Sequence, residues 1–181
     1  MQTSRSKLAF WTLLTAVVLI ALDQISKQAA IAFLAPNTST EFLGSVVKFY
    51  LIRNDAAAFS MGFGATWIFT IISSVATVVC VWFAFRIRTL PWALLLGGLL
   101  GGVAGNLLDR LFREPGFANG HVIDFIQIPF NFPIFNLADC AICVVAALTV
   151  IRVMRGDDVG GKRQATELAS TEPTANEIAS K

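Results

Sequence analysis

Four long apolar blocks constrain this sequence more than any other feature. They lie near residues 8–30, 65–85, 90–107 and 136–153, and each holds few or no charges except near its ends. A helix needs roughly 20 apolar residues to cross the hydrocarbon core of a bilayer. The sequence therefore predicts an all-α membrane protein with four transmembrane helices.

The composition agrees with a membrane protein, and the four apolar blocks leave too few residues for a separate soluble domain. Of the 181 residues, 55% are apolar and 14% are charged. In soluble domains, about a quarter of all residues are charged. We therefore expect one membrane domain over residues 1–155. Residues 156–181 are polar and lack aromatic side chains, a composition typical of a disordered tail. A net charge of +2 is too small to indicate binding to nucleic acid.

The positive charges predict an orientation. Cytoplasmic loops of membrane proteins carry an excess of Lys and Arg. If both termini are cytoplasmic, nine of the 14 Lys and Arg side chains lie inside: Arg5, Lys7, Arg86, Arg88, Arg152, Arg155, Lys162, Arg163 and Lys181. The tail is then cytoplasmic, and the four aspartates near the helix ends, Asp23, Asp109, Asp124 and Asp139, lie at the outer face.

Two outer loops carry the alternating pattern of β-strands. Residues 41–53 alternate β-branched and aromatic side chains with polar ones, and residues 122–126 do so again. Open strand edges cannot lie in hydrocarbon, because no water is present to satisfy their backbone groups. We therefore expect a small β-sheet element in the outer loops, at the membrane surface.

Small residues recur on the third predicted helix. Gly97, Gly101 and Gly105 are spaced by four residues, with Gly98 and Gly102 in a parallel register. This spacing lets helix backbones approach closely in membranes.

The three cysteines predict neither a disulfide framework nor a metal site. Cys80, Cys140 and Cys143 all fall inside predicted helices. The spacing of Cys140 and Cys143 could indicate a redox or metal pair, but no second pair and no histidine accompanies them. Small apolar fillers are the favoured interpretation.

Three clusters of polar residues lie near the outer ends of the predicted helices, where ionisable groups are costly and functional by default. Asp23 and Lys27 are four residues apart, so they can form an ion pair that ends the span. Asn54 lies in a run of small residues that fits a strand-to-helix corner or a close backbone approach. The third cluster, which fits a network at a helix end, holds Asn106, Asp109 and Arg110.

Two further aspartates are the strongest catalytic candidates. Asp139 is three residues after Asn136, which predicts a capping box at the start of the fourth helix. Asp124 lies between Ile123 and Phe125, where nothing structural requires a carboxylate. The two acids could converge at the membrane surface, and no rival catalyst is evident, since the only histidine, His121, would face away from Asp124.

Taken together and in order, the five clusters resemble the lipoprotein signal peptidases, the bacterial signal peptidase II family. The matching segments are DQISK at 23–27, NDAAAF at 54–59, GGVAGNLLDR at 101–110, VIDF at 122–125 and FNLAD at 135–139. The resemblance covers roughly residues 8–153. In one departure, Ala56 stands where the family usually has glycine.

The resemblance implies an aspartic endopeptidase of the cytoplasmic membrane. Its substrates would be prolipoproteins modified with diacylglycerol, cut just before the lipidated cysteine, with neither cofactor nor metal and with no obligate protein partner. The catalytic pair of this family carries over to Asp124 and Asp139. Its other polar positions, with roles in binding substrate or organising the site, carry over to Asp23, Lys27, Asn54, Asn106, Asp109, Arg110 and Asn136.

Two carboxylates in one site do not both ionise easily. We expect Asp139 to be the ionised member, because a helix N-terminus stabilises negative charge, and Asp124 to hold the proton. The alternative function is a small proton- or ion-coupled transporter with the aspartates as a relay, which predicts acids near mid-membrane in broken helices. A non-catalytic helix-packing partner would explain the glycines but not Asp124.

Overall fold

The computed structural model describes residues 4–55 and 66–157. Its four helices are α1 (Arg5–Phe33), α2 (Thr66–Ala84), α3 (Leu90–Phe112) and α4 (Leu137–Met154). Each is long and apolar enough to cross a membrane, so the prediction of four transmembrane helices is confirmed. Helix α3 extends five residues beyond its predicted end at 107, because the polar groups of its last turns have partners inside the protein.

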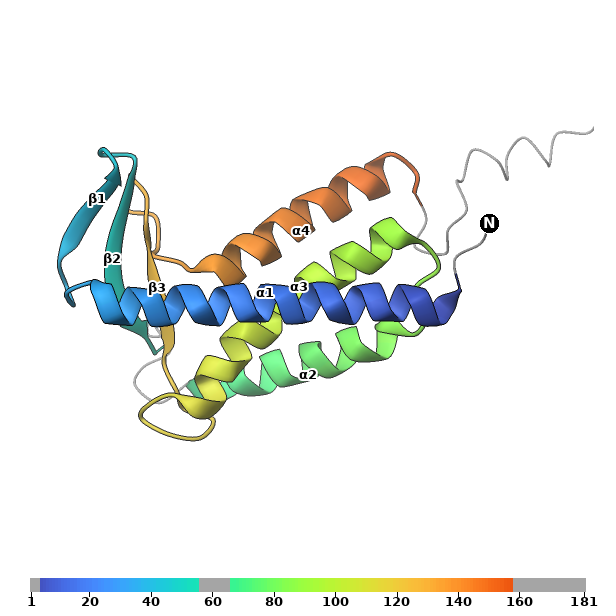
Figure 1. The fold of residues 1–181 in the computed structure, drawn as a ribbon, viewed down its shortest axis with the longest axis horizontal. Coiled ribbons are helices and arrows are strands. Elements are labelled where there is room, and N and C mark those ends of the chain that lie inside the picture. The colour runs from blue at the N-terminus through green and yellow to red at the C-terminus, as the bar shows by residue number, and fades with distance from the viewer. Residues whose placement is uncertain (1–3, 56–65, 158–181) are drawn as a thin grey trace, which may run out of the picture.

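Helix α3 is the centre of the bundle and contacts each of the other three helices (Figure 1). Its glycines permit this, because a Cβ atom at Gly97 would lie 2.5 Å from the backbone oxygen of Thr12 in α1. A Cβ atom at Gly102 would lie 2.7 Å from the backbone oxygen of Ala138 in α4. The two glycine registers therefore serve two different neighbours of α3.

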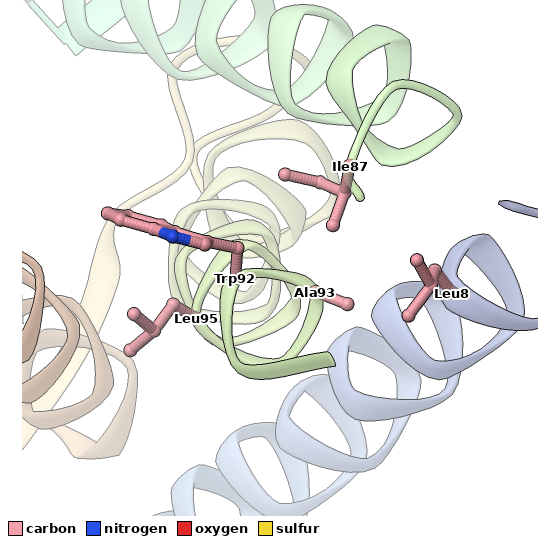
Figure 2. Close-up of a cluster of buried hydrophobic side chains, with 5 residues drawn as sticks. All are labelled: Leu8, Ile87, Trp92, Ala93 and Leu95. Atoms are coloured by element: carbon pink, nitrogen blue, oxygen red, sulfur yellow. The ribbon is translucent and has the colours of Figure 1, made fainter. Parts of the chain in front are cut away.

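One end of the bundle is closed by an apolar cluster that includes Leu8, Ile87 and Trp92 (Figure 2). Leu8 of α1 is fully buried and lies against the start of α3. Both ends of the described chain lie at this side of the bundle, in the right half of Figure 1.

The opposite end carries one three-stranded antiparallel sheet, with β1 (Ser39–Leu43), β2 (Val47–Asn54) and β3 (Val122–Gln127) in the order β1-β2-β3. The prediction of a small β-sheet in the loops that join the helices is confirmed. The region 41–53 is not one continuous strand, however, since a turn at Gly44, with φ +54°, divides it into a hairpin. The loop between α3 and α4 supplies β3, so both loops build the same sheet.

A bridge between Ile126 and Phe135 joins the sheet to the start of α4. The backbone N–H of Ile126 donates to Phe135 O at 2.8 Å, and that of Phe135 returns a bond to Ile126 O at 3.1 Å. This bridge closes the loop 128–134 at its base. It brings β3 next to the N-terminus of α4, although the two segments are separated in sequence. The predicted disordered tail lies outside the described residues from residue 158 onward.

Candidate active site

The two candidate carboxylates come from different elements that meet at the sheet end of the bundle. Asp124 is on β3 and is 2% exposed, and Asp139 is half-buried in the first turn of α4. Asp124 occupies a strand whose first four residues are all buried. A carboxylate in such a place needs hydrogen-bond donors, since an unpaired buried charge is costly.

Asn136 supplies donors to both acids. Its side-chain Nδ2 donates to Asp124 Oδ1 at 2.6 Å, and its backbone N–H donates to Asp139 Oδ2 at 3.1 Å. In return, Asn136 Oδ1 accepts from the backbone N–H of Asp139 at 3.1 Å. The predicted capping box is therefore confirmed, and the same asparagine links the two carboxylates.

Asp124 has a second amide partner at the end of β2. Asn54 Nδ2 donates to Asp124 Oδ2 at 2.8 Å, so each oxygen of this carboxyl group accepts one amide bond. Burial and, to a smaller extent, the nearby charge of Asp139 raise the pKa of Asp124 from 3.8 to about 6, although the two amide bonds act in the opposite direction. Asp124 can thus hold a proton under conditions in which an exposed aspartate cannot.

Asn106 on α3 connects the acid pair to the interior of the bundle. Its Nδ2 donates to Asp139 Oδ1 at 2.8 Å. Its Oδ1 accepts two bonds, from Lys27 Nζ at 2.9 Å and from Asn136 Nδ2 at 3.1 Å. Asn106 is therefore the junction between Lys27 and both candidate acids.

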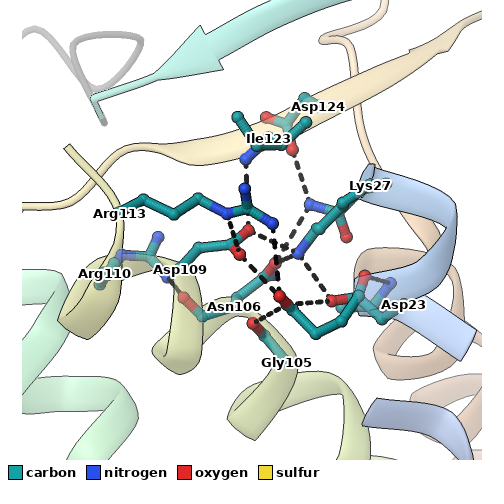
Figure 3. A network of polar contacts seen from close by, with 12 residues as sticks. Asp23, Lys27, Gly105, Asn106, Asp109, Arg110, Arg113, Ile123 and Asp124 are labelled. Carbon is teal, nitrogen blue, oxygen red and sulfur yellow. Dashed lines mark hydrogen bonds and ion pairs between the residues drawn. The ribbon is translucent and has the colours of Figure 1, made fainter. Parts of the chain in front are cut away.

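Lys27 is fully buried and lies between two carboxylates (Figure 3). Its Nζ is 2.8 Å from Asp23 Oδ2, as the four-residue spacing predicted, and 2.8 Å from Asp109 Oδ2 on α3. Asp23 also accepts the backbone N–H of Ala138 at 3.1 Å, and Asp109 accepts that of Ile123 at 3.3 Å. This ionic cluster therefore fixes the N-terminus of α4 and the strand β3 relative to α1 and α3.

Two members of this network, Gln24 and Arg113, were not predicted. Arg113 Nε pairs with Asp109 Oδ1 at 2.5 Å, and Gln24 Nε2 donates to the same oxygen at 3.1 Å. Arg113 follows Asp109 by four residues, so the helical pairing rule could have found it. With Arg113 included, the cluster holds two positive and two negative side chains. Its charges balance, as buried charges require.

Arg110 differs from the rest of the network because its guanidinium is only partly satisfied. Its Nη1 donates to the backbone oxygen of Asn106 at 3.3 Å, and its Nε is buried without a hydrogen-bond partner among the described residues. The guanidinium interacts electrostatically with Asp139 and Asp124. A positive group with a spare donor therefore lies beside the acid pair.

Every predicted site residue joins this one region, whether directly or through a neighbour. The four helices are uninterrupted. Asp109 lies in the last turn of α3 and Asp139 in the first turn of α4, whereas Asp23 lies ten residues before the end of α1. Ala56 and the three residues that follow it in the NDAAAF motif lie outside the described residues. Among residues 4–55 and 66–157, no group of three or more His, Cys, Asp and Glu side chains is placed to hold a metal ion.

Comparison with known proteins places this architecture among bacterial membrane enzymes. A solved structure described as a bacterial membrane enzyme at 1.9 Å resolution superposes with a TM-score of 0.71 and is 26% identical in sequence. The match covers 80% of this chain and 92% of the other. The fold and the buried polar site thus define a multi-pass membrane enzyme.

The chain belongs to the signal peptidase II family, whose model, described as "Signal peptidase (SPase) II", matches residues 15–155. It is 43% identical to the lipoprotein signal peptidase of Leifsonia xyli subsp. xyli, over 91% of this chain and 77% of that protein. With the lipoprotein signal peptidase of Mycobacterium leprae it shares 40% identity, over 85% of this chain and 78% of the relative. The chain is therefore a peptidase that removes signal peptides from prolipoproteins.

Proposed function

We propose that Asp124 and Asp139 form an aspartic catalytic pair that cuts diacylglyceryl-modified prolipoproteins just before the lipidated cysteine. The observation that carries the proposal is the shared asparagine. Asn136 donates to Asp124 Oδ1 at 2.6 Å and to Asp139 Oδ2 at 3.1 Å. The two carboxyl groups therefore both bind one residue, Asp124 through the side-chain amide of Asn136 and Asp139 through its backbone N–H, at the end of the bundle that carries the sheet.

In the proposed reaction, Asp139 is ionised and Asp124 holds a proton. The N-terminus of α4 stabilises the charge of Asp139, and burial raises the pKa of Asp124 to about 6. Asp139 takes a proton from the attacking water while Asp124 donates its proton to the carbonyl oxygen. The tetrahedral intermediate then collapses as its C–N bond breaks: the amine of the lipidated cysteine leaves with the proton from Asp139, and Asp124 takes back a proton from one hydroxyl as the carbonyl group re-forms. The signal peptide leaves with a new carboxyl terminus.

The remaining site residues have supporting roles in this proposal. Asn54, Asn106 and Asn136 hold the carboxyl groups through their amide donors. Asp23, Lys27 and Asp109 hold the elements that carry the pair. Arg110 Nε has no hydrogen-bond partner within the described part of the chain, and a donor in this place beside the pair suits a main-chain carbonyl of the substrate. With one proton on the pair, the positive charge of Arg110 balances the remaining negative charge.

The membrane orientation is part of the proposal. The excess of Lys and Arg on the side of both termini supports a cytoplasmic location for the termini and an outer location for the sheet and the acids. The signal helix of the substrate would lie among the enzyme's helices, with its diacylglyceryl group in the bilayer. The sheet would then cover the scissile bond at the outer surface.

The test is cleavage of a synthetic diacylglyceryl-modified prolipoprotein by the purified enzyme in detergent. Mass spectrometry of both products should show a cut on the amino side of the lipidated cysteine. A matched peptide without the lipid is the control and should be cut much more slowly. A cut at another position, or activity abolished by a metal chelator and restored by metal, would contradict the proposal.

A further inference from the structure

We propose that Lys27 is a positioning residue that sets the orientation of the Asn106 amide and, through it, of the hydrogen bonds to the acid pair. The inference rests on the proposed function of Asp124 and Asp139. It gives the fully buried ammonium group a role beyond that of joining helices.

The hydrogen bonds of Lys27 are completely used. An ammonium group has three N–H donors, and Nζ has three acceptors, at 2.8 Å on Asp23, 2.8 Å on Asp109 and 2.9 Å on Asn106. The two negative charges of Asp23 and Asp109 already balance the two positive charges of Lys27 and Arg113. The third N–H donor points at the neutral amide oxygen of Asn106. Its role is therefore to orient that amide and not to neutralise a charge.

This third bond leaves Asn106 only one stable orientation. Its Oδ1 accepts from Lys27 and from Asn136, so its NH₂ group must face Asp139, where Nδ2 donates to Oδ1 at 2.8 Å. In the flipped orientation the amide oxygen would face a carboxylate oxygen, and the NH₂ group would face the ammonium group. Both contacts are repulsive, and leaving a buried group unpaired costs about 1–3 kcal/mol.

The capping bond orients Asn136 itself. Its Oδ1 accepts the backbone N–H of Asp139, so its NH₂ group faces Asp124 and Asn106 and donates to both. Asn106 accepts its bond from Asn136 through the same oxygen that faces Lys27. The helix cap therefore orients Asn136, Lys27 orients Asn106, and together they turn the donors of both amides toward the two carboxyl groups.

Removal of the Lys27 donor should affect catalysis through the acid pair. An Asn106 amide that is free to flip no longer donates steadily to Asp139, and loss of a donor makes a carboxylate bind its proton more tightly. The charged groups that face this pair are Asp23 and Lys27 on α1, Asp109 and Arg110 on α3, and Arg113 beyond them. The acidic limb of the rate profile should therefore move to higher pH.

The substitution of Lys27 alone is not a clean test, because it leaves Asp23 and Asp109 buried with too little positive charge. We would compare three variants instead: D23N, D23N/K27M and D23N/K27Q. The two double variants carry the same charge as each other and as the wild type in this cluster. Glutamine retains an N–H donor for Asn106, whereas methionine has none.

The measurements are kcat and KM for the lipidated prolipoprotein as a function of pH, with thermal unfolding in detergent for each variant. D23N/K27M should show a kcat about 10- to 100-fold lower than D23N, a change in KM below about threefold, and an acidic limb about one pH unit higher. D23N/K27Q should recover most of the lost kcat. Equal profiles for the methionine and glutamine variants at matched stability would overturn the inference.

A second measurement needs only wild-type protein and covers the case in which a double variant does not fold. The side-chain ¹⁵NH₂ resonances of Asn106 should shift as the acid pair titrates, because this group faces Asp139. If the chemical shifts of these resonances do not change as the acid pair titrates, the NH₂ group does not face Asp139, and the inference is overturned. Cleavage by the single variants Asp124→Asn and Asp139→Asn tests the proposed function separately, so the two failures can be told apart.

Discussion

The two ends of the bundle are built from the same four helices by opposite means. At one end Leu8, Ile87 and Trp92 form a dry apolar cluster (Figure 2). At the other end Lys27, Asp23 and Asp109 are at most 1% exposed and bind one another through charge (Figure 3). A bundle that needed only stability could use apolar packing at both ends, since a buried ionic network is at best a weak source of stability.

The comparison therefore separates stability from function. The apolar end joins the helices through side chains that carry no charge. The polar end holds three asparagine amides at 2.6–2.8 Å from two carboxyl groups, at a cost in desolvation that the rest of the fold must offset. Substitutions at the two ends should accordingly change different measured quantities.

The largest expected effect is on catalysis at the polar end. Asp124→Asn and Asp139→Asn should each lower the rate of signal-peptide release by at least about a thousandfold, because the proton transfers need both groups. Insertion and folding should persist. The rates are measured with the lipidated substrate in detergent. Glu114→Gln, which removes an exposed carboxylate near the same end, is the matched control, and near-normal cleavage by either aspartate variant would refute the pair.

The pH dependence of stability should also distinguish the ends. The pKa of Asp124 is raised from 3.8 to about 6, so the folded protein holds a proton that the unfolded chain releases. The resulting stability is fully present below about pH 4 and is lost as the pH rises through about 6, with a total of at most about 3 kcal/mol. Thermal unfolding between these values should fall less steeply for Asp124→Asn than for the wild type. Parallel curves would contradict the raised pKa.

At the apolar end, Leu8→Ala should lower stability without lowering kcat. The fully buried side chain would leave a cavity beside the start of α3, which costs about 2 kcal/mol or more. Phe10→Ala on the same helix is the control, because Phe10 is 58% exposed. Unfolding in detergent and kcat per folded molecule are the measurements. A large loss of kcat for Leu8→Ala would show that the ends are coupled.

The smallest expected effect concerns the Thr70 hydroxyl, which is 3.2 Å from Thr66 O in its own helix and closer to an oxygen of the loop between α3 and β3. Thr70 Oγ1 lies 2.7 Å from the backbone oxygen of Ala118, to which it donates. Thr70→Val keeps the shape and removes this bond, which should cost about 1 kcal/mol of stability. Thr77→Val is the control, since the Thr77 hydroxyl bonds only within its own helix in the described structure. Equal losses for both variants would assign the cost to helix geometry alone.

The helices could be predicted because the length of an apolar block is a local property. The capping box of Asn136 and Asp139 and the pairing of Asp23 with Lys27 are local as well, and the structure confirms both. Each depends on residues within four positions of one another. Physical rules for a single helix are sufficient to find them.

The contacts between distant segments could not be predicted in the same way. Lys27 meets Asp109 and Asn106 only because the glycines of α3 let α1 approach closely. The alternation of side-chain types in residues 41–53 and 122–126 does not reveal that these two segments pair with each other in one sheet. Gln24 was missed because a glutamine near a helix end gives no signal of its own.

The bridge between Ile126 and Phe135 has a consequence for how this protein can vary. The bridge joins the two ends of the segment 128–134. The separation of the two acids is therefore set by the bridge and does not depend on the length of the segment between its ends. We therefore expect a change of length within that segment to leave the positions of the two acids unchanged.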